Sequence, residues 1–476
     1  MLALLELQTV ICIEMQNSKL IALLRTLKSE ERQRLEDFVA SPYHNKNDVL
    51  IHLLAQLHGF APAFDSPELE KSRVWARLYG KKPFDRSHFN HLVNYLLRLV
   101  EKFLAIEAVP ELLLDQIALE IYADRKLNKH YRFCQKQSKR KLEKSTFFDE
   151  RHYYFKFQQA RIQNQHFLLG KQRVFDPAIQ TASRNLDLFY LVQQLKLLSE
   201  MLDRQKKLIQ HYDLGTLQAV DFLLQKYVEA PNPYLMLYRQ HIRMLQEEEN
   251  KVHYFTYNRL MTTYAAQIRP DDRRQLYFYA INYCVRKIAG GADFHENLFE
   301  LYSSGLKNGV LFEDGVLSPW TFKNMVLLGL GLDKMQWVES FIEQYAGKLP
   351  DHFRKDAYHY NLAVLHYAKK DYSRAMTYLN QVVYSDISYK LWSKELLLKI
   401  YFETKETEPL LSLLTSFEAL IKRHKSIPKG QKEAYRNFLK IVAKLEKGKM
   451  PLSKIRALID ETSALRERKW LLAQCS

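Results

Sequence analysis

Apolar residues recur every three or four positions along most of this chain, the spacing that places side chains on one face of a helix. The clearest case is the stretch 356–383, which predicts two amphipathic helices joined by a tight turn. Asp371 stands between them as the predicted N-cap, since its carboxylate can accept an unpaired backbone N–H. The apolar positions are Tyr358, Leu362 and Leu365 in the first helix, and Tyr372, Ala375, Met376, Leu379, Val382 and Val383 in the second.

This predicted hairpin resembles a tetratricopeptide repeat, a helix pair of about 34 residues. Ala375 aligns with the alanine of the family's second helix, Leu362-Ala363 stand in place of its Leu-Gly pair, and Leu379 in place of its Phe. The chain departs from the family pattern at His359, where Trp is usual, and at Ile387, where Pro is usual. An ordinary antiparallel helix pair would show the same apolar spacing.

The same spacing predicts a smaller N-terminal helical unit at 18–108 and an array of helical hairpins over 109–476. Predicted helix starts at Ser318, Asp351 and near Ser385 are 33 and 34 residues apart, so a repeat period holds locally. A single hairpin cannot bury its apolar face alone, and stacked neighbours can share one core. We therefore expect an all-α fold, a solenoid of antiparallel helical hairpins of the tetratricopeptide type. The predicted helices of the array are 112–126, 129–144, 148–169, 186–208, 234–245, 254–267, 271–289, 297–307, 319–330, 334–345, 389–402, 410–424, 434–445 and 452–472.

In the N-terminal unit, helix starts are predicted at Ser29 and at Ser66-Pro67, and Asp85 is expected to cap a long helix. Residues 67–104 resemble the winged-helix units that accompany helical repeats in some bacterial transcription regulators. The likeness rests on Val74–Gly80 and on the leucines and arginine that follow, and it implies a role in nucleic-acid binding. The sequence shows no strands for a wing.

A second resemblance covers most of the chain. The segment 186–208 and the element SPYHNKN at 41–47 are similar to a group of uncharacterised bacterial helical-repeat proteins of about this length. This resemblance implies the repeat fold and no particular activity.

The composition agrees with a globular, helical protein. The chain has 476 residues, of which 47% are apolar, with only 14 glycines and 14 prolines. Its length exceeds what one core usually supports. The four cysteines, Cys12, Cys134, Cys284 and Cys475, lie far apart in sequence. This spacing predicts neither a disulfide framework nor a cysteine metal site, and it is typical of a reducing compartment.

The first 14 residues are apolar but lack a basic leader, so we interpret them as an extension before a start at Met15 or as a short extra helix. No apolar run approaches the roughly 20 residues that span a bilayer. These features predict a cytoplasmic protein.

The net charge of +17 is uneven, because residues 351–476 carry 24 Lys and Arg against 14 Asp and Glu. A basic field of this kind attracts acidic partners, including nucleic acid. A solvated helix face rich in lysine would give the same pattern. The densest basic stretch consists of Lys422, Arg423, Lys425, Lys429, Lys432, Arg436 and Lys440.

Motifs of catalytic sites are absent from the sequence. It contains no glycine-rich phosphate loop, no HExxH, no GxSxG and no CxxC pair. Gly329-Leu330-Gly331 is interpreted as a helix end, and His88 and His91 as a surface pair without a third metal ligand. We therefore expect no enzyme activity, no cofactor and no bound metal.

The resemblance to tetratricopeptide repeats implies a peptide-binding groove lined by the first helix of each pair, with an asparagine near its sixth position. Asn361 matches that position, and Asn324 and Asn282 precede it by steps of 37 and 42 residues. An amide can both donate to and accept from an extended peptide. The predicted groove residues are Asn282, Arg286, Lys323, Asn324, Tyr360 and Asn361.

These observations predict a non-enzymatic scaffold that binds an unidentified protein or peptide. The alternative is a nucleic-acid-associated transcriptional regulator that uses the winged-helix-like unit or the basic stretch.

Overall fold

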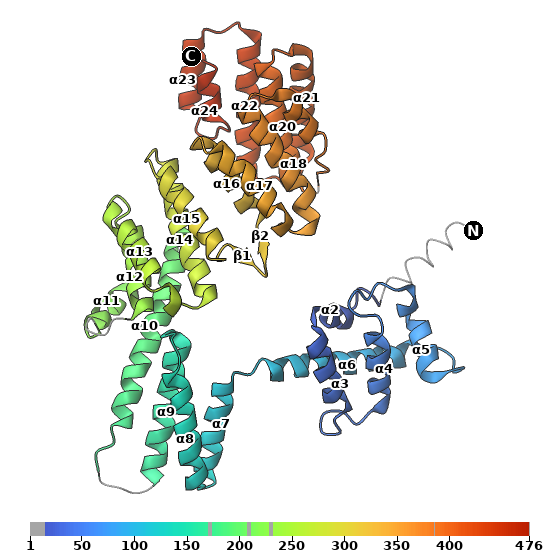
Figure 1. The fold of residues 1–476 in the computed structure, drawn as a ribbon, viewed down its shortest axis with the longest axis vertical. Coiled ribbons are helices and arrows are strands. Elements are labelled where there is room, and N and C mark those ends of the chain that lie inside the picture. Colours follow the sequence, from blue (N-terminus) through green and yellow to red (C-terminus); the bar gives the residue numbers. More distant parts are fainter. Residues whose placement is uncertain (1–14, 170–173, 207–210, 228–231, 385, 476) are drawn as a thin grey trace. The chain divides into compact units, whose positions relative to one another are not determined.

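The computed structural model describes residues 15–169, 174–206, 211–227, 232–384 and 386–475 (Figure 1). The described residues form an all-α fold, which confirms the predicted class. Their only sheet is a two-stranded antiparallel ribbon of β1 (Phe312–Glu313) and β2 (Val316–Leu317). The chain divides into two compact units. The first holds residues up to 145 and 151–186, and the second holds 146–150 and 187–476. Residues 1–14, with the predicted extension or extra helix and Cys12, lie outside the described residues.

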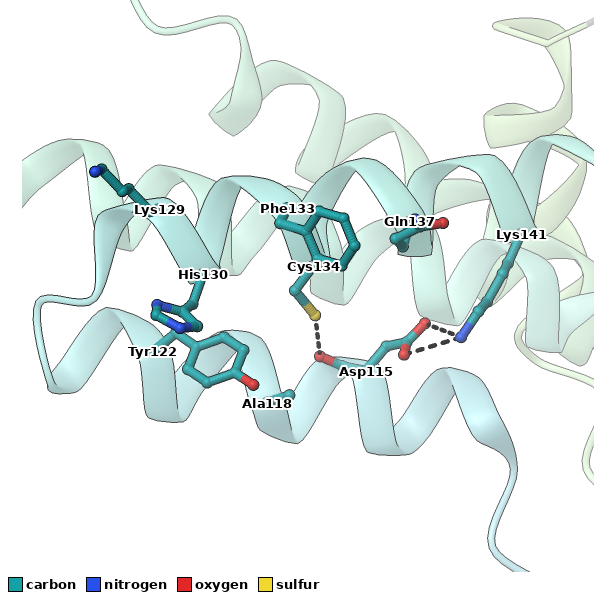
Figure 2. Close-up of a pocket in the computed structure, with 9 residues that line it drawn as sticks. All are labelled: Asp115, Ala118, Tyr122, Lys129, His130, Phe133, Cys134, Gln137 and Lys141. Carbon is teal, nitrogen blue, oxygen red and sulfur yellow. Dashed lines mark hydrogen bonds and ion pairs between the residues drawn. The ribbon is translucent and has the colours of Figure 1, made fainter.

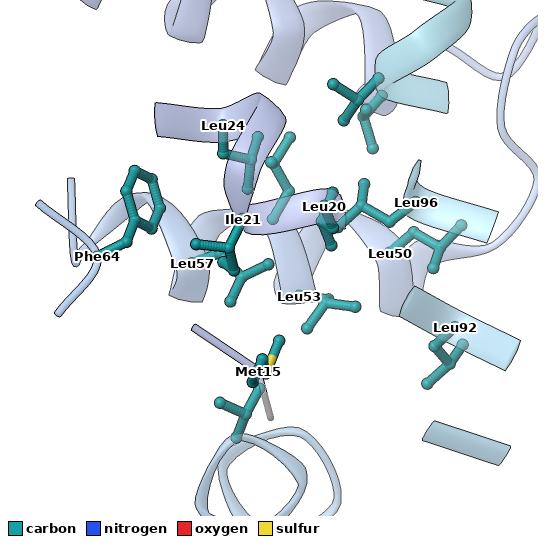
Figure 3. Packing of buried hydrophobic residues seen from close by; sticks show 14 of the residues in the cluster. Met15, Leu20, Ile21, Leu24, Leu50, Leu53, Leu57, Phe64, Leu92 and Leu96 are labelled. Atoms are coloured by element: carbon teal, nitrogen blue, oxygen red, sulfur yellow. The ribbon is translucent and has the colours of Figure 1, made fainter. Parts of the chain in front are cut away.

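The first unit begins with five α-helices around one apolar core. These are α2 (Lys19–Thr26), α3 (Ser29–Ala40), α4 (Asp48–His58), α5 (Lys71–Tyr79) and α6 (Arg86–Glu107). Figure 3 shows how leucines of α2, α4 and α6 meet Met15 and Phe64 in this core. The side chain of Asp85 caps α6 by accepting from the N–H of His88, as predicted.

Two details of this unit differ from expectation. Ser66 caps a short 3₁₀ turn at Pro67–Leu69, and α5 starts only at Lys71. Described residues 15–108 contain no β-strand, so they lack the wing that defines a winged-helix unit, and that resemblance finds no support in the fold.

The rest of the first unit contains α7 (Glu111–Asp124), α8 (Asn128–Glu143) and α9 (Glu150–Leu169). Leu119 and Ala123 of α7, Tyr131 of α8 and Ile162 of α9 form a small core distinct from the one around α2. The predicted boundary at residue 108 thus lies between two apolar clusters of the first unit. That residue 108 separates two domains remains a prediction.

Helix α10 (Ala178–Gln205) begins in the first unit and ends in the second. It is followed by α11 (Leu217–Gln225), α12 (Pro233–Gln246), α13 (Lys251–Thr263), α14 (Pro270–Ala289) and α15 (His295–Lys307). Helix α12 packs against α13, and α14 packs against α15. Asn232 and Asn250 cap α12 and α13 because their side-chain oxygens accept backbone N–H groups of the first turn.

The second unit ends in a run of helices that pack in chain order: α16 (Pro319–Gly331), α17 (Met335–Tyr345), α18 (Asp351–Ala368), α19 (Tyr372–Leu379), α20 (Ile387–Glu403), α21 (Thr407–Arg423), α22 (Lys429–Lys447), α23 (Leu452–Glu461) and α24 (Arg468–Ala473). Each of α16, α18 and α20 packs against the helix that follows it. In addition α16 contacts α18, and α18 contacts α20, so these three lie side by side.

The predicted central hairpin is formed by α18 and α19. Asp371 caps α19 by accepting from the N–H of Arg374, which confirms the prediction. Ala375 is fully buried. Helix α19 ends at Leu379, so Val382 and Val383 follow the helix, contrary to expectation.

The predicted helix 452–472 is wrong as a single element. It is two helices, α23 and α24, because the chain leaves the helical conformation at Thr462 and Glu467 adopts a left-handed backbone with φ of 54°. The break lets the segment before α24 return to α20. No helix of the described parts of the chain has the length and apolar content needed to cross a bilayer.

Candidate binding cavity

Helices α16, α18 and α20 enclose a cavity of about 220 Å³ in the second unit, together with the segment that precedes α24. Each helix contributes residues spaced by three or four positions, which helical geometry places on one face. The lining consists of Lys323, Leu327 and Leu330 from α16; Tyr360, Val364, Tyr367 and Ala368 from α18; Trp392, Glu395, Leu396 and Lys399 from α20; and Arg466 and Glu467.

A buried ion pair forms one wall of the cavity. The guanidinium of Arg466 donates to both carboxylate oxygens of Glu395 at 3.0–3.2 Å, and Glu395 is only 4% exposed. Such a pair tolerates burial because the planar guanidinium satisfies both oxygens. Arg466 reaches Glu395 only because the chain breaks between α23 and α24.

Glu467 extends the ion pair into a network. Its carboxylate lies 2.8 Å from Nζ of Lys399 and is hydrogen-bonded to Glu395. Burial raises the pKa of Glu395 to about 8, although Arg466 opposes the shift. Burial also works against ionisation of Glu467, but Lys399 and the hydrogen bond to Glu395 hold its pKa below the usual value. The two carboxyl groups therefore titrate as a coupled pair, in which Glu395 binds a proton more readily than Glu467.

Lys323 is the one cation of the lining without an anionic partner among the described residues. Its Nζ lies 3.9 Å from the centroid of the Trp392 ring, a cation–π contact. Burial lowers the pKa of Lys323 to about 8. The ammonium therefore stays largely protonated at neutral pH. It lies against an aromatic face, and the carboxyl groups of Glu395 and Glu467 act on it through space without forming an ion pair.

Aromatic rings complete the cavity wall. The ring centroid of Trp392 lies 5.8 Å from that of Tyr360 and 5.3 Å from that of Tyr389. Leu327, Leu330 and Val364 add aliphatic surface. The cavity thus combines an apolar interior with one incompletely neutralised positive charge.

Two of the six predicted groove residues, Lys323 and Tyr360, line this cavity. Their neighbours in sequence do not, since adjacent residues of a helix point in different directions. Asn324 is exposed and interacts with the hydroxyl of Tyr302 on α15. Asn361 is fully buried, and its amide donates to the carbonyl of Ala357 at 2.7 Å. Asn361 therefore lies in the core and not on the surface of a groove, contrary to the prediction.

The remaining two predicted groove residues belong to a separate network on α14. The amide of Asn282 donates to Asp203 at 3.1 Å, and Arg286 bridges Asp203 and Glu248 at 3.1 and 2.9 Å. Lys206 pairs with Glu248 from the other side. These polar groups pair with one another and not with the lining of the cavity, so the six predicted residues do not form one continuous set.

The predicted basic stretch extends over the end of α21 and over α22. Lys422, Arg423, Lys425, Lys429 and Lys440 are exposed, whereas Lys432 and Arg436 are half-buried. The members on α22 are spaced by three and four residues and share one face. In the described residues, none of the seven forms an ion pair.

The first unit contains a larger cavity, of about 530 Å³, between α7 and α8 (Figure 2). Lys141 contacts Asp115 at 2.9 Å and Glu111 at 2.6 Å, whereas Lys129 of the lining forms no ion pair with the described residues. The Cys134 thiol donates to the carbonyl of Asp115, and burial raises its pKa, so it stays protonated. Lys129 is exposed to solvent, whereas Lys323 is half-buried against an aromatic ring.

Further candidate chemistry is limited. Among the described residues, no group of His, Cys, Asp and Glu side chains is arranged to hold a metal ion. His88 contacts the hydroxyl of Tyr79 at 2.9 Å on the surface of the first unit.

Comparison of the chain with protein-family models, curated proteins and solved structures found no match. The resemblance to tetratricopeptide repeats therefore rests on the residues of the hairpin alone.

Sequence reasoning missed Trp392, Glu395, Arg466 and Glu467. Trp392 and Glu395 stand three positions apart on a predicted helix, and Lys399 follows four positions later, so periodicity could have placed them on a common face. Arg466 and Glu467 were missed because the break between α23 and α24 was not predicted.

Proposed function

We propose that the second unit is a non-enzymatic scaffold that binds a protein or peptide partner along α16, α18 and α20. In this proposal α16 to α23 form a tetratricopeptide-like solenoid, and its first helices present the binding face. The proposal rests on the cavity where these helices meet, which joins aromatic rings to the partnerless Lys323. A half-buried charge without an ion-pair partner reduces stability, so the presence of Lys323 in the lining supports a role in binding.

A pair of matched variants tests this face. Leu327 on α16 lines the cavity and is 44% exposed, and Leu411 on α21 is 43% exposed but lies outside the lining. Both accept arginine without burying its charge. We expect Leu327→Arg to abolish capture of the partner by the tagged full chain from nuclease-treated native extract, and Leu411→Arg to preserve it. Equal capture by both variants would overturn the proposal.

A second candidate function is binding to nucleic acid through the basic stretch. The observation in its favour is the row of basic residues on α22 without acidic partners. Contacts to six phosphates would lower affinity about a thousandfold or more between roughly 50 and 200 mM salt. Binding through the aromatic cavity would change far less.

The matched variants for this candidate each remove two exposed lysines. One is Lys429→Ala with Lys440→Ala, and the control is Lys348→Ala with Lys355→Ala, all four being exposed. Fluorescence anisotropy with a labelled oligonucleotide should show a slope of log K against log salt reduced by about 2 for the first variant alone. The same slope in both variants would exclude this stretch as the contact surface.

A further inference from the structure

We infer that the cavity around Lys323 is a site for a small organic acid, in which a carboxylate pairs with the ammonium and an apolar body packs among the leucines and aromatic rings. The inference goes beyond the scaffold function, since it assigns a free small molecule to the cavity irrespective of any partner on the outer surface of these helices.

The charges of the lining support an anionic ligand. Three cations, Lys323, Lys399 and Arg466, face two carboxyl groups, Glu395 and Glu467. Arg466 and Lys399 are each paired with one of these carboxyl groups. The unpaired ammonium is Lys323, so a ligand carboxylate would restore its charge balance.

The position of Lys323 suits direct contact with a ligand. Its ammonium is held at 3.9 Å over the Trp392 ring, which fixes the cation without neutralising it. Lys323 is half-buried, and a cation without an ion-pair partner in such a place is costly to remove from water, so adding an anion in the same cavity is favourable. Because the ring already restrains the lysine side chain, little additional entropy is lost when a ligand binds.

The size and the remaining surface of the cavity limit the ligand. A volume of about 220 Å³ is below the roughly 300–1,000 Å³ of pockets that hold drug-sized molecules. It accommodates one small acid, or a single side chain of a partner bound along these helices. Leu327, Leu330, Val364 and Ala368 offer an aliphatic surface beside the rings. The ligand class is therefore a monocarboxylic acid with an apolar or aromatic body.

The affinity of such a ligand should depend on the protonation of Lys323. Burial lowers its pKa to about 8, and only the protonated form pairs with a carboxylate. Binding should be constant between the pKa of the ligand's carboxyl group and this value, and should weaken as the pH rises through it. The other charged or titratable groups of the lining are Glu395, Glu467, Lys399, Arg466, Tyr360 and Tyr367. Both tyrosines stay neutral because burial raises the pKa of each.

Isothermal titration of the full chain tests the site with phenylacetate and hexanoate, each compared with its neutral amide. We expect the acids to bind and the amides not to bind. Lys323→Met should lower the affinity for the acids by about tenfold to a hundredfold, the effect of one charge-assisted hydrogen bond. The control Lys355→Met removes an exposed lysine of α18 and should leave the affinity unchanged.

Equal affinity for acids and amides, or equal affinity in Lys323→Met and the control, would overturn the inference. So would no detectable binding of either acid at about 10 mM, which is about ten times the dissociation constant of a weak, 1 mM ligand. Thermal unfolding of Lys323→Met checks that the variant is folded. If small acids fail to bind but a captured partner still requires Leu327, the scaffold function stands and the small-molecule site is wrong.

Discussion

The indole N–H of Trp470 donates to the carboxylate of Glu403 at 2.7 Å, across 67 residues of sequence. The same carboxylate accepts from the hydroxyls of Tyr367 and Tyr372 and from Nζ of Lys370. Glu403 therefore connects α18, the start of α19, α20 and α24. Four donors converge on one side chain that is 11% exposed, so its loss would leave several polar groups without a partner.

Replacement of Glu403 by alanine should lower the free energy of unfolding by about 3 kcal/mol, since it removes the acceptor for four donors. Glu418→Ala is the control, because Glu418 is exposed near the middle of α21. Urea denaturation of both variants measures the difference. Similar stability in the two variants would show that the network contributes little.

The lowered pKa of Glu403 should make the stability of the fold depend on pH. Burial disfavours the charged form, but the hydrogen bonds from Trp470, Tyr367, Tyr372 and Lys370 lower the pKa of Glu403 to about 2. A carboxyl group with a lowered pKa in the folded state stabilises the fold above its unfolded value of 4.5. That contribution should decrease as the pH falls from this value towards 2. Urea midpoints measured across the range should decline more steeply for the wild-type chain than for Glu403→Gln.

A side chain at Gly329 should clash where α16 packs against α17. A Cβ atom at this position would lie 2.6 Å from Cγ2 of Val338 and 3.3 Å from the Trp337 ring. Gly329→Ala should therefore destabilise the fold by about 1–3 kcal/mol, as overpacked substitutions do. Gly331→Ala, two residues further along, meets no atom within 4 Å and should be neutral or slightly stabilising.

A double-mutant cycle examines the buried ion pair. Arg466→Met leaves the carboxyl group of Glu395 buried without its partner and should lower stability by about 3–5 kcal/mol. The double variant with Glu395→Met should recover much of that loss, because an apolar pair of similar size needs no compensating charge. Thermal unfolding of the two single variants and the double variant provides the measurement. Additive losses would mean that the two side chains are not coupled.

Local signals made much of the fold predictable. Helix α16 was expected at 319–330 and spans Pro319–Gly331, and Asp371 was identified as a cap from its type and position. The break before α24 was not predictable in this way, since the sequence TSALR at 462–466 has neither Gly nor Pro. Tertiary contacts of Arg466 and Trp470 hold the chain there.

The candidate site was predictable only in part. Lys323 and Tyr360 were predicted to lie on one binding face, and both line the cavity. Asn361 follows Tyr360 directly, so its side chain points in a different direction and lies in the core. Arg466, which pairs with Glu395, lies 71 residues away in sequence. The spacing of apolar residues within a helix does not predict contacts between segments so far apart.

This long separation has a consequence for the order of folding. Pairs such as α18 and α19 join neighbouring segments, so their closure involves short loops and should be rapid. The contacts of Arg466 and Trp470 require the closure of a much longer loop, which has a larger entropic penalty. The α16–α20 layer should therefore form first with an open side, and the cavity should be completed in a late step. Pulse-labelled hydrogen exchange should show amides of α18 protected before those of α24.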